Sequence, residues 1–150
     1  MVSRKLVKTV AFPARSKPHM LRVSPDGREV WVQTAEANTN VVLDASDLRV
    51  LSTEPTGKQP VTNAWTRDRR YAVVTNGQDT FAQIFDARTF KEVKRLTIGQ
   101  GGANIGLSAD GKTAFIAVRG LNEVAVIDLA TLALESRIKA GTEPQGLIVR

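Results

Sequence analysis

An internal repeat with a period of 42 residues is the feature that most constrains the fold of this chain. Three columns of identical residues recur at this spacing, two of aspartate and one of glycine. They are Asp26, Asp68 and Asp110; Asp44, Asp86 and Asp128; and Gly57, Gly99 and Gly141. Other columns contain similar but not identical residues, such as proline, hydroxyl-bearing or large apolar residues, and keep the same register without insertions. A fixed period of this length is typical of arrays in which each unit buries its apolar faces against its neighbours.

Each unit is expected to hold four short β-strands and no helix. In the first copy the strands fall near Met20 to Ser24, Glu29 to Thr34, Asn40 to Asp44 and Leu48 to Thr53. The Asp26-Gly27 pair between two alternating runs predicts a hairpin. No window repeats apolar residues at a spacing of about 3.6 for long enough to predict a helix. The sequence therefore predicts an all-β fold, a β-propeller segment of four-stranded antiparallel blades.

The repeat register divides the chain into three complete blades with a partial blade at each end. The three complete blades are expected over residues 18–59, 60–101 and 102–143. Residues 1–17 contain an outer strand (Lys5 to Phe12) of a preceding blade, and residues 144–150 contain an inner strand (Gln145 to Val149) of a following blade. Closed propellers contain about 4 to 8 blades. Closure as a simple dimer is awkward, because two other strands separate the inner and outer strands of a blade. We therefore expect a longer chain to supply the missing blades, with oligomerisation as the alternative.

Several segments resemble the YVTN family of β-propeller repeats. Tyr71 to Asn76 is similar to the Tyr-Val-Thr-Asn signature, with two residues in place of one. The other matches are Pro18-His19, Ser24 to Gly27, Ile98-Gly99 and Val126 to Asp128, and the departures are Trp31 to Thr34 and Arg67 to Arg70. The resemblance implies a propeller and a location in the periplasm or at the cell surface. It implies no single function, because such repeats occur both in surface proteins and in cofactor-bearing oxidoreductases.

Composition and charge narrow the range of functions. The absence of cysteine excludes disulfides and thiolate metal sites. No stretch approaches the roughly 18 apolar residues of a membrane span, and the start of the sequence has no signal-peptide pattern. The net charge of +6 arises in residues 1–28, with seven basic residues and one acidic residue, whereas the other 122 residues carry 14 of each. Aromatic residues are only 5% and scattered, so a nucleic-acid surface, which combines basic and aromatic residues, is not favoured.

Candidate binding residues come from two sets of loops that share one face of a propeller. One set joins an outermost strand to the next innermost strand, and the other joins the second strand of a blade to the third. The first set carries His19, Lys58, Gln59, Gln100, Asn104, Glu143 and Gln145, and the second carries Asn38, Asn40, Gln78, Asp79, Arg119 and Asn122. Arg22 lies on an innermost strand, where it can face the channel and bind an anion. The residues predicted to bind ligand are His19, Arg22, Asn104, Arg119 and Gln145.

The motifs that could suggest catalysis have simpler structural explanations. His19 is the sole histidine, and its column mates Val61, Ala103 and Gln145 supply no further metal ligand. The aspartate columns repeat one turn in successive blades, where side-chain bonds to backbone amides explain them. Gly99 to Gly102 precedes no helix, which argues against a phosphate-binding loop. The glycine column instead predicts a backbone role such as positive φ.

The sequence thus favours a noncatalytic binding or scaffold module whose polar loop face meets a protein, a glycan or a small ligand. It contains no recognisable Ser/His/Asp set, metal cluster or cofactor motif, so no catalytic residue, metal or cofactor is predicted. The alternative is the propeller part of an enzyme, such as a haem- or quinone-dependent oxidoreductase or a sugar lactonase. In that case the catalytic residues would lie outside these blades.

Overall fold

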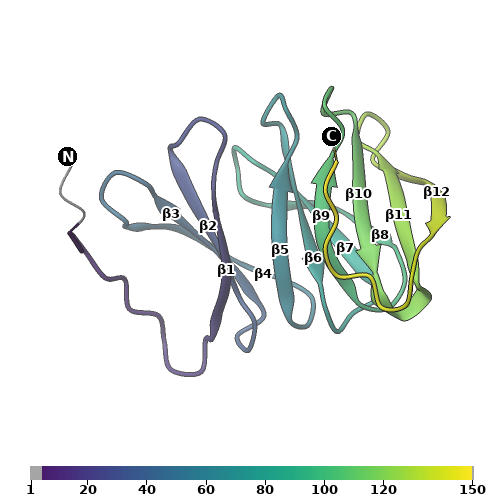
Figure 1. Ribbon diagram of the computed structural model, residues 1–150. Helices are drawn as coiled ribbons and strands as arrows, with labels where there is room; N and C mark the ends of the chain where they lie inside the picture. The colour runs from purple at the N-terminus through teal and green to yellow at the C-terminus, as the bar shows by residue number, and fades with distance from the viewer. Residues whose placement is uncertain (1–4, 150) are drawn as a thin grey trace.

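The computed structural model describes residues 5–149 and contains three four-stranded antiparallel sheets (Figure 1). Sheet 1 consists of β1 (Pro18–Val23), β2 (Glu29–Thr34), β3 (Thr39–Asp44) and β4 (Val50–Pro55). Sheet 2 consists of β5 (Pro60–Trp65), β6 (Tyr71–Asn76), β7 (Phe81–Asp86) and β8 (Glu92–Thr97). Sheet 3 consists of β9 (Gly102–Leu107), β10 (Thr113–Val118), β11 (Glu123–Asp128) and β12 (Ala133–Lys139), with a 3-10 turn, η1 (Arg119–Leu121), between β10 and β11. The predicted all-β fold is confirmed.

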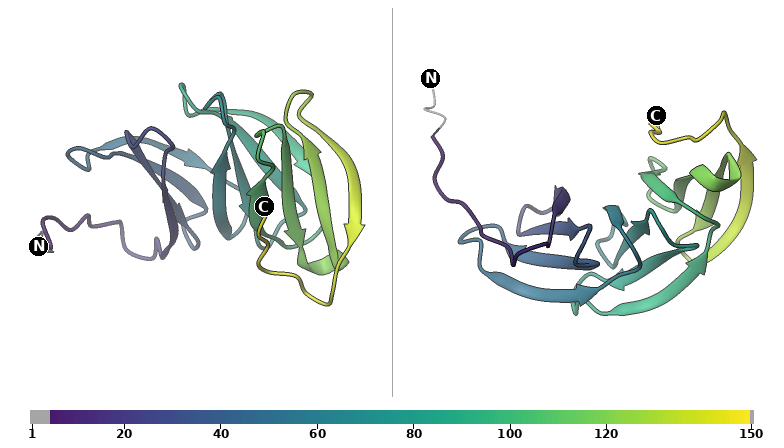
Figure 2. Two further views of the ribbon diagram at one scale, coloured as in Figure 1. Left: turned by 45° about the horizontal axis from the view of Figure 1, so that its top comes forward. Right: turned by 90° about the horizontal axis from the view of Figure 1, so that it is seen from below.

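The sheets follow one another along an arc, with the first strand of each on the concave side (Figure 2, right). The inner strand β5 contacts both β1 and β9, and the outer strands β8 and β12 also approach each other. Each sheet therefore turns a face toward its neighbour, which is how the blades of a β-propeller are arranged.

Burial along the strands reflects this arrangement. β6, the second strand of the middle sheet, is buried along nearly its whole length, because sheets 1 and 3 cover its two faces. Its composition, rich in valine and threonine, suits a strand covered on both sides. β1 is exposed along its whole length, because it lies at the inner edge of the first sheet.

The aspartate columns have the turn role predicted for them. Asp26, Asp68 and Asp110 each accept a bond from the hydroxyl two residues earlier and from the backbone N–H two residues later. Asp44, Asp86 and Asp128 each accept a bond from the backbone N–H two residues later, in the turn before the outer strand. These carboxylates satisfy turn amides that no sheet ladder can reach.

Positive φ, the example given of a backbone role for the glycine column, occurs at only one of its three positions. Of Gly57, Gly99 and Gly141, only Gly99 has positive φ, at 102°. At Gly57 an added Cβ would lie 2.8 Å from both Asn76 Cγ and Asp79 Oδ2. That glycine is required because neighbouring side chains approach the backbone closely.

The two terminal segments predicted as lone strands are not strands in the structure. Residues 5–12 and 145–149 have no strand assignment, because neither has a ladder partner among the described residues. The first segment still packs on sheet 1, where Val10 and Phe12 cover the core of Val32, Val41 and Leu43.

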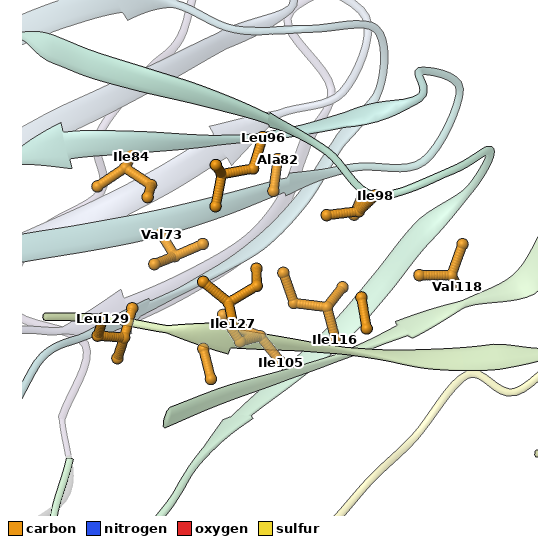
Figure 3. Close-up of a cluster of buried hydrophobic side chains, with 12 residues drawn as sticks. Val73, Ala82, Ile84, Leu96, Ile98, Ile105, Ile116, Val118, Ile127 and Leu129 are labelled. Carbon is orange, nitrogen blue, oxygen red and sulfur yellow. The ribbon is translucent and has the colours of Figure 1, made fainter. Parts of the chain in front are cut away.

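Two different cores lie between the sheets. The core between sheets 2 and 3 is aliphatic (Figure 3). Its largest buried members include Val73, Ile84, Ile98, Ile105, Ile116 and Ile127. The core between sheets 1 and 2 is aromatic, because Trp31 packs edge-on against Trp65 with ring centroids 5.5 Å apart. Phe85 and Phe90 also pack edge-on against Trp31.

Candidate functional site

Backbone hydrogen bonds join the two predicted sets of loops into one face, here called the loop face. Gln59 O accepts from Gly77 N at 2.7 Å, and Gly101 O accepts from Arg119 N at 3.1 Å. Each bond links the loop entering a sheet to the loop between the second and third strands of that sheet. Asn38 Oδ1 also accepts from Gln59 N at 2.8 Å, which connects sheet 1 to the same network. The loops that carry the candidate residues are thereby fixed in position.

A cavity of about 260 Å³ opens on the loop face at the inner ends of the sheets. It is lined by His19, Met20, Gln59, Val61, Ala103, Asn104, Arg119, Gln145 and Gly146. Four of these residues, His19, Val61, Ala103 and Gln145, hold the same repeat position in successive units, so they converge around the axis that the inner strands share. The structure thus brings together four predicted residues: His19, Asn104, Arg119 and Gln145.

Arg119 reaches across from sheet 3 to sheet 2. It follows β10, and its Nη2 donates to Gly77 O at 3.1 Å. Gly77 leaves room for the guanidinium, because a Cβ there would lie 3.2 Å from Nη2. Gly101 lies beside the stem, where a Cβ would be 3.4 Å from Arg119 Cβ. The first two copies carry Ala35 and Gly77 at this repeat position, so the charge is a feature of the third copy alone.

The other polar groups of the cavity are neutral amides and one imidazole. His19 Nδ1 lies 3.4 Å from Val61 O, and the backbone N–H of Asn104 donates to Gln145 O at 3.2 Å. The side-chain amides of Gln59, Asn104 and Gln145 can each donate and accept hydrogen bonds. No carboxylate is among the lining residues. The cavity therefore offers one fixed cation beside groups that suit hydroxyls or other uncharged polar atoms.

The structure does not bring Arg22 to this cavity. Arg22 lies on the inner strand β1, as predicted, but its Nε donates to Thr62 Oγ1 of β5 at 3.2 Å. The side chain lines a separate hollow of about 390 Å³. The other residues lining that hollow are Val23, Ala64, Trp65, Ile105, Gly106 and Leu107.

A larger hollow of about 510 Å³, between sheets 2 and 3, is lined largely by hairpin turns. Among its charged groups, Asp68, Asp110 and Arg67 already have hydrogen-bond partners within the protein. Asp68 accepts bonds from the Thr66 hydroxyl and the Arg70 backbone N–H, and Arg67 Nη1 donates to Ala109 O at 3.3 Å. The loop-face cavity is the better candidate, because its amides and guanidinium have no carboxylate beside them, whereas Asp68 and Asp110 line the larger hollow.

Sequence reasoning missed part of the cavity wall. Val61 and Ala103 share the repeat column of His19. This column predicts that they lie near His19, but it does not predict that they line a cavity. Met20 carries no polar signal, and the need for Gly77 arises only from the reach of Arg119. A repeat register predicts which positions converge, whereas the reach of a long side chain depends on the packed structure.

Two general features of residues 5–149 bear on function. No group of three or more His, Asp or Glu side chains in this range is arranged to hold a metal ion. No helix within these residues is long and apolar enough to cross a membrane.

The fold and its loop-face cavity define a segment of a β-propeller protein. The sequence matches no protein-family model and no curated protein. Solved structures are similar: the hydrazine synthase of Kuenenia stuttgartiensis has a TM-score of 0.83 and 23% identity over 95% of this chain. A periplasmic gluconolactonase of Pseudomonas aeruginosa has a TM-score of 0.76 and 18% identity over 91% of the chain. The WD40 repeats of RRP9 have a TM-score of 0.80 and 12% identity over 88%.

The chain spans less than half of each of these proteins. The matched share is 41% of the hydrazine synthase chain, 43% of the gluconolactonase and 41% of RRP9. At such low identities the likeness establishes the propeller fold and carries no specific activity.

Proposed function

We propose that this chain contributes a noncatalytic binding face to a β-propeller, with a small polar ligand or the end of a glycan seated in the loop-face cavity. The observation that carries the proposal is the convergence of His19, Asn104, Arg119 and Gln145 around one cavity. At about 260 Å³ the cavity is just below the usual range of about 300–1,000 Å³ for small-molecule sites, so a single sugar-sized ligand suits it better than a protein segment.

Three expectations from the sequence form part of this proposal. The chain is a YVTN-type propeller protein, it acts in the periplasm or at the cell surface, and further blades complete the ring. The repeat signature in β6 supports the first. The half-buried Phe115 and exposed Ile138 on the free side of sheet 3 support the last, because their repeat counterparts in sheet 2, Val73 and Leu96, are buried against sheet 3.

The second candidate function is the propeller part of an enzyme. Two of the similar structures are described as a hydrazine synthase and a periplasmic gluconolactonase, which favours an oxidoreductase or a sugar lactonase. The catalytic residues would then lie outside this segment. Hydrolysis of D-glucono-δ-lactone above the uncatalysed rate by a longer chain that includes the remaining blades, and not by this segment alone, would support the enzyme over the binding module.

The binding proposal is tested by NMR titration of the 150-residue chain with D-glucose and D-gluconate. We expect chemical-shift changes centred on the side-chain amides of Asn104 and Gln145, at ligand concentrations up to about 10 mM. Asn104→Ala should weaken the response. Gln78→Ala, which removes an exposed loop-face amide outside the cavity, should leave it unchanged. If neither compound moves these resonances, the proposed binding site is wrong.

A further inference from the structure

We propose that the loop-face cavity selects ligands bearing a small oxyanion, a sugar acid or a sugar phosphate, with the Arg119 guanidinium as the anchor for the anion. This inference rests on the proposed binding function and names the chemical class of its ligand. It follows from the position of Arg119, from the charge around it and from the neutral groups that face it.

Arg119 is held in place before any ligand arrives. Its Nη2 donates to Gly77 O at 3.1 Å, and the backbone at Gly77 and Gly101 lies close to the side chain. Its Nε is buried and has no hydrogen-bond partner within residues 5–149, and neither Nη1 nor Nη2 is in the same condition. A guanidinium has five N–H donors, so one backbone acceptor leaves most of them unused. A pre-organised cation loses little side-chain entropy when an anion binds.

No protein carboxylate competes for this cation. Among residues 5–149 Arg119 takes part in no ion pair. Asp79, the acidic residue of the neighbouring loop, accepts the backbone N–H of Lys58 at 2.6 Å. Glu143 is exposed and is not part of the cavity wall. A fixed positive charge in a cavity without acidic residues favours an anionic ligand.

The remaining polar side chains of the cavity are three neutral amides and the imidazole of His19. Gln59, Asn104 and Gln145 line the same cavity as the guanidinium with amides that both donate and accept, which is the pattern that recognises hydroxyls. The apolar lining residues Met20, Val61 and Ala103 can cover the carbon skeleton of a ligand. A molecule with an anionic end and hydroxyl groups therefore uses the whole cavity, whereas inorganic phosphate or acetate uses only the cationic part.

The test compares a neutral sugar with two anions derived from it, of which the sugar phosphate keeps the same ring. Isothermal titration calorimetry of the 150-residue chain at low salt would use D-gluconate, D-glucose 6-phosphate and neutral D-glucose. We expect at least one of the two anions to bind about tenfold or more tightly than glucose, because hydrogen bonds between charged groups are worth about this factor. The anion that binds more tightly shows whether the cavity prefers a carboxylate or a phosphate. The advantage should shrink as salt is raised, because salt screens the charge.

Arg119→Gln should remove the advantage of the anion and leave glucose binding within about twofold, since one charge is lost from the site. Arg67→Gln is the matched control, because Arg67 also reaches a backbone oxygen 42 residues away across the interface of sheets 2 and 3, but outside the cavity. It should change neither affinity. Arg119→Lys should bind the anion with intermediate affinity, because the charge stays while the planar fork is lost.

Each outcome separates the two proposals. If glucose and both anions bind equally well to the wild type, the oxyanion inference is overturned while the binding site stands. If none of the three compounds binds, the binding site falls as well. An anion preference that persists in Arg119→Gln and disappears in Arg67→Gln would overturn the inference by locating the anion at the larger hollow. Should Arg119→Gln fail to fold, a reduced anion preference in Arg119→Lys supports the inference, and an unchanged preference contradicts the guanidinium as the anchor.

Discussion

The two interfaces between neighbouring sheets have the same backbone repeat and very different side chains. Between sheets 2 and 3 the buried residues of the core are all aliphatic. Between sheets 1 and 2, Trp31 and Trp65 form the centre of an aromatic cluster. Nearer the loop face the same interface buries a set of amides, in which Gln33 Nε2 donates to both Asn40 Oδ1 and Asn63 Oδ1 at 3.0 Å. One blade geometry thus accepts two kinds of core.

The repeat columns explain how this substitution is possible. Gln33, Asn40 and Asn63 in the first interface correspond to Thr75, Ala82 and Ile105 in the second. All six side chains are buried or nearly so. The polar set must therefore satisfy its amides internally, and it does so only in part: Gln33 Oε1, Asn40 Nδ2 and Asn63 Nδ2 have no hydrogen-bond partner within residues 5–149. The comparison predicts that the two interfaces respond differently to substitution.

The largest effect is expected for Trp31→Ala. This side chain is fully buried and contacts aromatic rings of the neighbouring sheet 2, so its removal leaves a large cavity that the neighbouring strands cannot close. We expect the free energy of unfolding to fall by about 3–5 kcal/mol. Guanidinium unfolding followed by far-UV circular dichroism measures the change. A loss below about 1 kcal/mol would show that the aromatic cluster does not hold sheets 1 and 2 together.

The next effect concerns the buried amides. Gln33→Leu removes the donor to Asn40 and Asn63 and leaves two buried acceptors unpaired, which should cost about 1–3 kcal/mol of stability. The triple variant Gln33→Thr, Asn40→Ala, Asn63→Ile carries the side chains of the second interface into the first. It should be less destabilised than the single variant, because unpaired polar groups cost more than groups removed together. A triple variant less stable than Gln33→Leu would mean that the amides contribute net stability.

A smaller effect is expected in the aliphatic interface. Ile116→Val removes one methylene group from a fully buried residue, and the surrounding aliphatic side chains can partly close the gap. The free energy of unfolding should fall by about 0.5–1.5 kcal/mol in the same denaturation experiment. Val73→Ala, in the sheet that faces Ile116, should show an effect that is not additive with it, because neighbouring side chains share one cavity. Strict additivity would contradict direct packing between the two.

Much of this architecture follows from the sequence because the repeat fixes the register. The aspartate columns predict the hairpin turns, and the column of His19, Val61, Ala103 and Gln145 explains why its members meet at one cavity. The binding role of these residues stays a prediction. The separation of Arg22 was not predictable, because its bond to Thr62 depends on the spacing of two inner strands.

Other features depend on contacts that a repeat pattern does not encode. The terminal segments read as strands because they alternate like their repeat counterparts, yet a strand needs a hydrogen-bonded neighbour. The requirement for glycine at position 57 arises from Asn76 and Asp79 of the next sheet, which a search for positive φ cannot detect. The same applies to the buried amides, whose three members lie on three different strands.

The last difference between the interfaces lies in the hairpin turns. The repeat column of Gly27 and Gly111, with φ of 73° and 71°, contains Arg69 in sheet 2, with φ of 56°. A side chain in this left-handed conformation is strained. Arg69 pairs with Asp26, and its Nη2 donates to Glu29 Oε1 at 3.2 Å, so ionic contacts join sheets 1 and 2. The corresponding position at the next interface is a glycine.

Arg69→Gly removes the strain together with the ion pairs, so at neutral pH it should change stability by about 1 kcal/mol or less. Burial raises the pKa of Asp26, but the Ser24 hydroxyl, the Arg28 backbone N–H and the Arg69 charge outweigh it and hold the pKa below its ordinary value of 3.8. A lowered pKa contributes stability above that ordinary value, and the contribution is lost as pH falls through the lower, folded-state pKa. Wild type should therefore lose more stability than Arg69→Gly on acidification below about pH 4, so that the stability of the variant rises relative to that of wild type.

Urea unfolding at a series of pH values measures this difference, with Arg67→Gln as the control whose pH dependence should match wild type. Identical pH dependence in all three proteins would show that the ion pairs across the first interface contribute no stability, and that the contrast between the two interfaces is confined to their cores.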